Sequence, residues 1–336
     1  MPEKKKAGDT KNFGLVAIGN ALVDVLARVD DNFLQARAML KGGMALIDTA
    51  AAQALAAAVQ AEKEMSGGSA ANSLAGFVSY GGNGAFLGKV AGDRFGGVFR
   101  ADMDSQGVHF PTAPHTGAEE TGRSYIMVTP DGERTMNTYL GANAAFGPDD
   151  VDEDVIADAK IILVEGYLFD QPGTKAAFIK AANAAHAAGT KVAFTLSDHK
   201  CVGRHHAEFA DLVENHVDIL FGNEKELKAL TLKEDFDDAA RDIGSKCAVA
   251  IITRGSKGAV IVADGVQHVI APVKPRALVD TTGAGDAFAA GVLYGLAEGR
   301  SYDEAGHLGA MAASHTISHT GARDPAVKFS SFLRQP

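Results

Sequence analysis

Residues 280–288 have the sequence Asp-Thr-Thr-Gly-Ala-Gly-Asp-Ala-Phe, and an apolar run through Tyr294 follows directly. A glycine-rich turn that opens into a helix presents free backbone N–H groups and the positive end of the helix dipole. Such a turn binds phosphate. The carboxylate of Asp286 would lie among these N–H groups, where a general base could take the proton of a hydroxyl that attacks a phosphoryl group. The alternative is an ordinary turn in which Asp286 is a capping acid.

Short apolar runs alternate with helix-length segments over most of the chain that precedes this turn. Alternation of this kind predicts an α/β fold with a mostly parallel central sheet and helices on both faces, a three-layer α/β/α sandwich. The segments Ala50–Glu64 and Ser69–Tyr80 are expected to be helices. The expected strands are Val16–Gly19, Ala85–Gly88, Ile161–Val164, Lys191–Leu196, Asp218–Phe221 and Ala250–Thr253.

Two segments, at about 21–48 and 112–142, break this rhythm. In the second, the runs Arg123–Val128 and Glu133–Met136 flank Thr-Pro-Asp-Gly at 129–132, which predicts a β-hairpin. Strands inserted into an α/β chain indicate a small accessory sheet, so we expect these segments to form a lid on a single domain over residues 13–336. Residues 1–12 are polar and lysine-rich, and we expect a disordered tail there.

Composition excludes several classes of protein. The chain has 336 residues, 46% of them hydrophobic and 22% charged, as in soluble globular proteins. Its net charge of −10, without a long basic run, argues against binding to nucleic acid or to an anionic membrane. The apolar runs are too short to span a bilayer, and the first residues lack the apolar segment of a signal peptide. We therefore expect a cytoplasmic protein.

The cysteines and histidines of the sequence do not indicate a metal site or a reactive thiol. Cys201 and Cys247 are the two cysteines of the sequence, which excludes a disulfide framework and a four-cysteine zinc site. His199, His205 and His206 lie near one another in the sequence but match no metal-binding spacing, so surface histidines are expected.

Four motifs, in order, resemble those of the ribokinase-like (PfkB-type) carbohydrate and nucleoside kinases. They are Gly67-Gly68-Ser69-Ala70-Ala71-Asn72, Asn223-Glu224-Lys225-Glu226, Thr253-Arg254-Gly255-Ser256-Lys257-Gly258, and Asp280 to Asp286. The resemblance implies transfer of the γ-phosphoryl group of ATP to a primary hydroxyl. It implies Asp286 as the base, with the backbone of Gly283, Ala284 and Gly285 stabilising the developing charge.

On the acceptor side, the resemblance implies that Asp24 accepts hydrogen bonds from two sugar hydroxyls and that Asn20 lines the same pocket. Gly68, Ser69 and Asn72 would complete it, because glycine admits close approach and an amide offers both donor and acceptor. By themselves, Asp24 would more often be a turn or lid-base residue, and Gly68 to Asn72 would indicate a glycine-rich helix start.

On the nucleotide side, Thr253, Gly255 and Gly258 would contact the phosphates. Asn223 and Glu226 would hold Mg²⁺, Glu226 through water, although an N-cap with a capping-box glutamate fits the same spacing. The lid arginine, Arg134, resembles one aimed at the transferred phosphoryl group, and a solvated hairpin arginine is the equal alternative. Two further pairs are implied: Ser314 and His315 beside the base, with core packing as alternative, and Asp280 and Thr282 in a monovalent-cation loop for K⁺.

The segments 218–224 and 194–197 and the helical segment 309–317 are similar to the adenosine kinase branch, whose activity belongs to purine salvage. A nucleoside needs an apolar or aromatic slot for its base, and Tyr167 and Leu168 are candidates. Leu168 and the segment 198–200 depart from that branch, so ribose, fructose or a related sugar is the alternative acceptor. An exposed lid sheet could also pair with a second subunit to form a homodimer.

Overall fold

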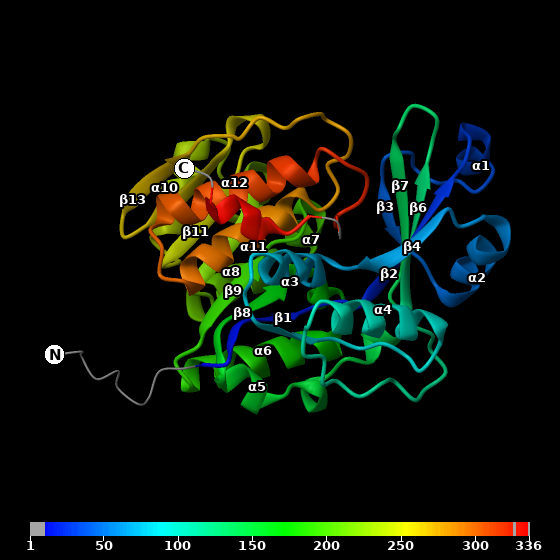
Figure 1. Ribbon diagram of the computed structural model, residues 1–336, viewed down its shortest axis with the longest axis horizontal. Coiled ribbons are helices and arrows are strands. Elements are labelled where there is room, and N and C mark those ends of the chain that lie inside the picture. Colours follow the sequence, from blue (N-terminus) through cyan, green and yellow to red (C-terminus); the bar gives the residue numbers. More distant parts are fainter. Residues whose placement is uncertain (1–10, 325–326, 335–336) are drawn as a thin grey trace.

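The computed structural model describes residues 11–324 and 327–334, in which two β-sheets are joined by helices (Figure 1). The larger sheet has eight strands in the order β13-β12-β11-β10-β9-β8-β1-β5. Strands β5 to β11 of this sheet, with β1, run parallel, and β12 and β13 are added antiparallel at one edge. The strands are β1 (Phe13–Ile18), β5 (Gly84–Leu87), β8 (Ala159–Glu165), β9 (Lys191–Thr195), β10 (Ile219–Asn223), β11 (Val249–Thr253), β12 (Ala259–Ala263) and β13 (Val266–Ile270).

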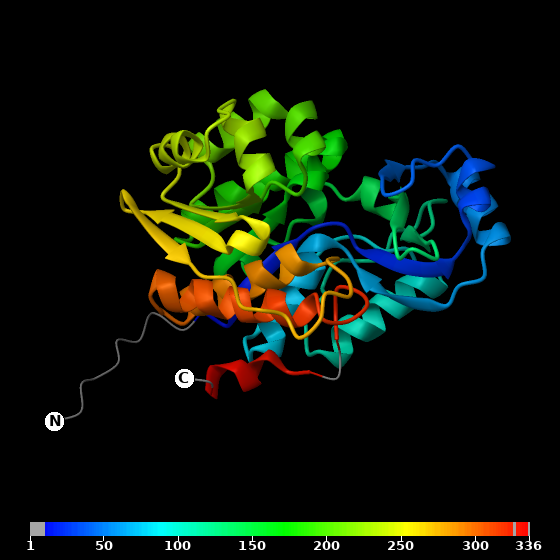
Figure 2. The same cartoon turned by 90° about the horizontal axis from the view of Figure 1, so that it is seen from above.

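Helices cover both faces of the larger sheet, as the alternation of runs predicted. Successive residues of a strand point to opposite faces, so Val16 and Ile18 pack into one apolar layer and Leu15 and Ala17 into the other. In Figure 2 the green helices lie on one side of the sheet, and α3, α11 and α12 lie on the other. The first layer holds α5 (Glu153–Ala157), α6 (Pro172–Ala187), α7 (His199–Arg204), α8 (His206–Asn215), α9 (Glu224–Thr231) and α10 (Phe236–Gly244), and the second α3 (Ser69–Ser79), α4 (Arg94–Ser105), α11 (Ala284–Ala297) and α12 (Tyr302–Thr316).

The smaller sheet forms the lid, and Figure 1 shows it beside the main body. Its order is β3-β7-β6-β2-β4, and β6 and β7 are the predicted hairpin. One face is covered by its own helices, because Val25, Tyr125 and Met127 pack against Leu34 and Leu55. The elements are β2 (Leu22–Arg28), α1 (Asp31–Gln35), β3 (Met44–Leu46), α2 (Thr49–Ala58), β4 (Lys63–Gly67), β6 (Gly122–Val128) and β7 (Arg134–Tyr139).

One secondary-structure prediction is wrong. The helix expected over residues 50–64 ends at Ala58, and Lys63–Gly67 form strand β4. Strand β4 pairs antiparallel with β2, with Asp24 opposite Met65. The alanine-rich sequence favours a helix, but the edge of β2 supplies hydrogen bonds that only a strand can use. The lid therefore also contains residues 49–67, beyond the two segments expected from the sequence.

Short 3₁₀ segments connect several of these elements. They are η1 (Gly141–Ala145), η2 (Pro148–Asp150), η3 (Gly166–Asp170), η4 (Gly255–Lys257) and η5 (Phe329–Arg334). Of the expected tail, residues 1–10 lie outside the described residues. Lys11 and Asn12 bond to the main body, through Thr190 and Asp158. No helix among the described residues has the length and apolar character needed to cross a bilayer.

Candidate active site

The glycine-rich turn lies at the start of α11, with Gly283 as its N-cap residue. Gly283 has a φ of +75°, and a Cβ atom there would lie 2.4 Å from the Cβ of Ala322, so only glycine fits. Asp286, in the first helical turn, accepts hydrogen bonds from Ser69 Oγ at 2.6 Å and from Asn72 Nδ2 at 2.9 Å. Two of the predicted motifs, distant in sequence, thus meet at one carboxylate.

Asp286 is partly buried, and its electrostatic surroundings are mixed. Burial raises its pKa, whereas the hydrogen bonds from Ser69 and Asn72 and the positive charge of Arg323 lower it. A carboxylate with a raised pKa is a better proton acceptor once ionised, because its basicity approaches that of the working pH.

The helix α3 begins at the second glycine-rich motif. Gly68, its N-cap residue, has a φ of +93°, and a Cβ atom there would lie 2.2 Å from the carbonyl oxygen of Asn20. Glycine therefore lets the start of α3 approach the end of β1. Asn20, which is 4% exposed, is held there by Glu165, whose Oε1 accepts from both the backbone and the side-chain nitrogen of Asn20.

Asp24 lies on the inner face of the lid, which faces the glycine-rich turn. Its carboxylate abuts Gly67, where a Cβ atom would lie 2.5 Å from it. The pKa of Asp24 is raised to about 7, chiefly by burial and also by the negative charge of Asp286, whereas the positive charges of Arg323 and Arg134 oppose the rise. The two acids thus lie close enough for their charges to interact across the lid and the main body.

Arg134 of β7 connects the lid to the glycine-rich turn. Its guanidinium forms an ion pair with Asp280 Oδ2 at 2.7 Å and donates to Thr282 Oγ1 at 3.2 Å. Asp280 also accepts from the backbone of Thr282 and of Gly321. Arg134 already neutralises the Asp280 carboxylate in this arrangement, so these residues do not fit a monovalent cation at that carboxylate.

A cavity of about 220 Å³ lies beside Asp286, at the carboxyl ends of β9, β10 and β11. Glu226, which is 6% exposed, lines it, and burial raises the pKa of this side chain to about 7. Asn223 and Glu226 form a complete capping box at the start of α9, which confirms the N-cap with a capping-box glutamate. Ser197, with a φ of +68°, also lines the cavity; such strain in a non-glycine residue is concentrated at functional sites.

A second cavity, of about 680 Å³, adjoins the first, and Thr253, Gly285 and Phe288 line both. Gly255, Gly258 and Ser314 line its walls together with apolar residues such as Val273 and Ile317. A cavity of this size with apolar walls and few polar groups suits a nucleotide base and ribose.

The structure separates Ser314 from His315. His315 packs at a tilted angle against the ring of His319 and contacts the rings of Phe329 and Phe332, away from the larger cavity. Adjacent residues of a helix point about 100° apart, so one of the two faces the cavity and the other packs against η5. The alternative of packing is therefore correct for His315.

Tyr167 and Leu168 are likewise separated. Tyr167 is partly buried, and its hydroxyl lies 3.5 Å from the carbonyl oxygen of Ser197, which lines the smaller cavity. Leu168 is 2% exposed within the apolar layer formed by α5 to α10. The structure does not bring Leu168 into the site.

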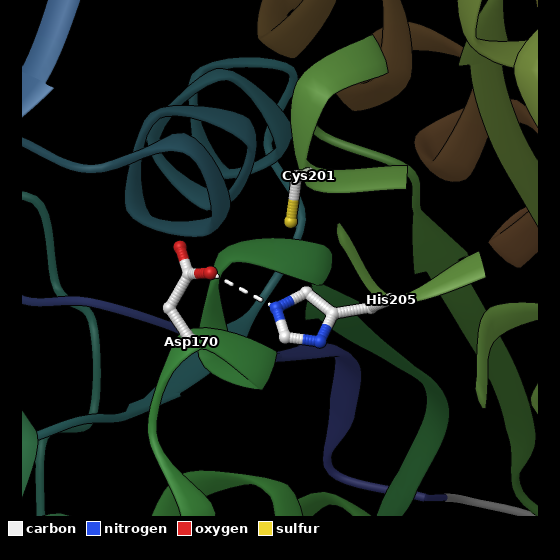
Figure 3. Close-up of side chains that lie close together, drawn as sticks. All are labelled: Asp170, Cys201 and His205. Atoms are coloured by element: carbon white, nitrogen blue, oxygen red, sulfur yellow. Dashed lines mark hydrogen bonds and ion pairs between the residues drawn. The ribbon is translucent and has the colours of Figure 1, made fainter. Parts of the chain in front are cut away.

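One residue of the histidine-rich segment, His205, lies close to Asp170 and Cys201 (Figure 3). His205 lies between Asp170, at 3.0 Å, and Glu208, at 3.1 Å, so it is not the free surface histidine that was expected. Cys201 points toward the same group, but burial raises its pKa to about 12. Because Arg204 already pairs with Asp170, the positive charge that a metal would supply is present.

Two residues at the site escaped prediction. Glu165 is 1% exposed, accepts from Ala70 N at 2.9 Å as well as from Asn20, and so joins β8, β1 and α3. Its position directly after an apolar strand was a usable signal. Arg323 bonds to Asn72 at 2.8 Å. Its sequence context offered no signal, because its partners come from three elements distant in sequence.

The fold and the connected cavities around the glycine-rich turn define a phosphotransferase with an alcohol group as acceptor. A model of the pfkB family of carbohydrate kinases matches residues 39–328. The chain belongs to this family.

Relatives with different acceptors resemble the chain closely. The structure of adenosine kinase from Sinorhizobium meliloti is 44% identical, with a TM-score of 0.90 over 96% of this chain and 99% of that one. The structure of a probable sugar kinase protein from Rhizobium etli CFN 42 is 43% identical, with a TM-score of 0.91 over 96% and 98%. The ATP-dependent ribose-1-phosphate kinase of Halopiger xanaduensis is 31% identical over 80% of this chain and 85% of its own length.

Proposed function

We propose that this kinase transfers the γ-phosphoryl group of ATP to a primary hydroxyl of a nucleoside, with adenosine as the favoured acceptor. The choice of acceptor rests on the residues that lie on the inner face of the lid. Residues paired directly across a sheet share one face, so Asp24 lies in a row with Met65, Ser124, Thr138 and Leu46. The next row on the same face is Leu26, Ile126, Met136 and Met44, with Lys63 at its edge.

Apart from Asp24, Ser124, Thr138 and Lys63, the residues of these two rows are apolar, which suits a planar base better than a free sugar. Leu46 is 47% exposed at one edge, so a large apolar side chain there still has surface to cover. Ser124 and Thr138 place two hydroxyls, 3.0 Å apart, among the apolar residues. A few polar groups in an apolar wall are the usual means of orienting a base.

Different residues of the chain would perform the separate steps of phosphoryl transfer. Asp24 and Asn20 would hold the acceptor by its ribose hydroxyls, which leaves the primary hydroxyl near Asp286. Asp286 would take the proton of that hydroxyl as its oxygen attacks. The N–H groups at the start of α11, from Gly283 to Gly285, would stabilise the charge that develops on the transferred group.

Mg²⁺ fits the smaller cavity, because the buried carboxylate of Glu226 and the hydroxyls of Ser197 and Thr253 are hard oxygen donors. Bound there with its waters, it would neutralise phosphate charge. Arg134, positioned beside Thr282, would add a second positive charge and keep the lid closed against water.

A sugar acceptor is the second candidate. Asn20, Asp24 and Asn72 offer hydrogen bonds that a free sugar would use equally well, and the relatives include a probable sugar kinase and a ribose-1-phosphate kinase.

A panel of acceptors distinguishes the two candidates. The purified chain is given ATP, Mg²⁺ and, separately, adenosine, inosine, guanosine, ribose, fructose and ribose 1-phosphate, and ADP formation is measured. We expect kcat/KM for adenosine to exceed that for ribose by about a hundredfold or more, because the lid face contributes only to a base. Equal values, or preference for a sugar, would contradict the proposal.

A further inference from the structure

Arg323 is a buried arginine in the segment that follows α12. Its side chain is 11% exposed. The guanidinium Nε donates to Asn72 Oδ1 at 2.8 Å, and Nη1 donates to Ser66 Oγ at 2.8 Å and to Asp102 Oδ2 at 2.7 Å. One side chain thus joins the end of β4, the first turn of α3 and the helix α4.

The amide of Asn72 has one possible orientation under these contacts. An amide has one oxygen that accepts and one nitrogen that donates. Since Arg323 can only donate, Asn72 must turn its oxygen toward it, which leaves Nδ2 to donate to Asp286 Oδ2 at 2.9 Å. Without the guanidinium, the hydrogen bond to Asp286 alone would hold the amide, and Asn72 could turn away from the carboxylate.

Arg323 also places a positive charge near two carboxylates whose ionised forms are destabilised by burial. Its positive charge lowers the pKa of Asp286 and of Asp24, against the rise that burial causes in both. Other charged or titratable groups face this region from the lid (Arg134 on β7), the main sheet (Glu165 on β8), η3 (Tyr167) and α4 (Asp102).

We propose that Arg323 is a positioning residue for phosphoryl transfer, which fixes the Asn72 amide and thereby holds Asp286 correctly oriented toward the acceptor hydroxyl. The proposal rests on the function proposed above, in which Asp286 is the base. It assigns to Arg323 no contact with the acceptor or with ATP.

A cavity of about 320 Å³ lies beside this arginine and makes the proposal testable by chemical rescue. Arg323, Asn72, Ser66 and Asp102 line it. The Nη2 atom of Arg323 is buried and has no hydrogen-bond partner within residues 11–324 and 327–334. Truncation of the side chain would enlarge a cavity that is already wide enough for a guanidinium ion.

The test compares Arg323→Met, Arg323→Lys and Arg323→Ala with Arg100→Met as control. Arg100 is a partly buried arginine of α4 that bonds to backbone carbonyls away from the site. ADP formation is measured from about pH 6 to about pH 9.5 with the panel acceptor that the unmodified enzyme phosphorylates fastest.

For Arg323→Met we expect kcat near neutral pH to fall roughly 10- to 100-fold, because the base is misplaced and more often protonated. The acidic limb of the kcat/KM profile should move to higher pH, so that part of the loss is recovered at alkaline pH. KM for ATP should not change. Arg323→Lys should retain intermediate activity, and guanidinium chloride at millimolar concentration should restore part of the activity of Arg323→Ala.

Three outcomes would overturn the inference. They are an unchanged kcat and pH profile, an equal loss at every pH without rescue, and a rise in acceptor KM alone. Asp286→Asn, measured in parallel, separates this inference from the proposed function. If that variant is fully active, the assignment of the base fails; if it is inactive while Arg323→Met is normal, only the role of Arg323 fails. Should Arg323→Met not fold, Arg323→Lys and the rescue decide.

Discussion

Asp286 combines two requirements that oppose each other. It lies at the N-terminus of a helix, where a negative charge is favoured, yet it is close to the negative charge of Asp24 and removed from water. Ser69, Asn72 and Arg323 compensate for that burial. The side chain is thus held in one place by groups that also favour its ionised form.

Replacement of the Asp286 carboxylate should lower the activity without lowering the stability of the fold. For Asp286→Asn we expect kcat to fall by roughly 10²- to 10⁴-fold, the usual contribution of a general base. The melting temperature of the ligand-free protein should equal or exceed that of the original chain, because a buried charge next to Asp24 is removed. Steady-state kinetics and calorimetry measure the two effects.

The control for this variant is Asp211→Asn, an exposed position on α8, which should change neither quantity. Near-normal turnover of Asp286→Asn would contradict the assignment of the base.

At the level of single residues, the sequence predicted the motifs better than the directions of the side chains. Asp286 and Asn72 meet because each belongs to a contiguous motif with little freedom of placement, and Asp24 lies close enough for its charge to interact with that of Asp286. Leu168 and His315 do not reach the site, although Ser314 lines the larger cavity and Tyr167 bonds to Ser197, which lines the smaller one. Which of two neighbours faces a cavity depends on the phase of a helix or turn, and composition does not reveal that phase.

At the level of elements, the lid is attached to the main body by an ion pair at its tip. Arg134 on β7 bonds to Asp280 and Thr282, at the turn that precedes α11. The same arginine would approach the transferred phosphoryl group, so closure of the lid and completion of the site involve one side chain.

Removal of this ion pair should uncouple ATP cleavage from acceptor phosphorylation. For Arg134→Met we expect acceptor phosphorylation to fall roughly tenfold or more, because we propose that this arginine acts on the phosphoryl group. The fraction of ATP that is hydrolysed by water should rise, because the lid closes less firmly. Parallel assays of ADP and phosphorylated acceptor measure that fraction.

Arg37→Met is the matched control, since Arg37 is an exposed arginine of the lid that bonds only locally, to Phe33. If both variants behave alike, the ion pair has no part in closure.

From the apolar residues on the inner face of the lid we derive a separate prediction about the affinity for the acceptor. For Leu46→Ser we expect KM for adenosine to rise by about tenfold, the effect of losing roughly one buried leucine contact. The rate with ribose should not change. Leu40→Ser is the control, because Leu40 is even more exposed, at 75%, and lies in the loop that precedes β3. Equal effects on adenosine and ribose would argue for a sugar acceptor.

Among the elements, the parallel strands and the hairpin were predictable because each carries its own local pattern. Strand β4 was not, because its pairing with β2 depends on a partner about 40 residues away in sequence. Alanine-rich sequence favours a helix wherever tertiary hydrogen bonds do not compete, and there they do compete.

At the scale of the whole molecule, the ligand-free site is destabilising above neutral pH. Burial raises the pKa of Asp24, Glu165 and Glu226 each to about 7, against about 4 in an unfolded chain. Between about pH 4 and about pH 7 the folded protein therefore binds more protons than the unfolded protein. These groups contribute stability below that window, and the contribution is lost as the pH rises through about 7.

We therefore expect the melting temperature of the ligand-free protein to rise when the pH is lowered from about 8 to about 6. Asp24→Asn should show a smaller rise and a higher melting temperature near pH 8, because one of the three buried charges is absent. Calorimetry at a series of pH values measures both. A melting temperature that falls steadily over the same range would contradict the assigned direction of the shifts.

Arg323 shows what sequence patterns miss at this scale. Its three partners, Ser66, Asn72 and Asp102, belong to a lid strand and two helices that only the complete fold brings together. No local spacing marks such a residue, whereas a motif marks the groups that it supports.

The helices α1 and α2, which pack on the outer face of the lid sheet, bear on how the enzyme would work in dilute solution. If that face of the sheet were exposed, a second copy of the chain could pack against it. The turnover number would then fall on dilution, because the copies would separate. Here the chain shields that face with its own residues and contributes every group named at the reaction centre. We expect the turnover per molecule to stay constant down to nanomolar enzyme.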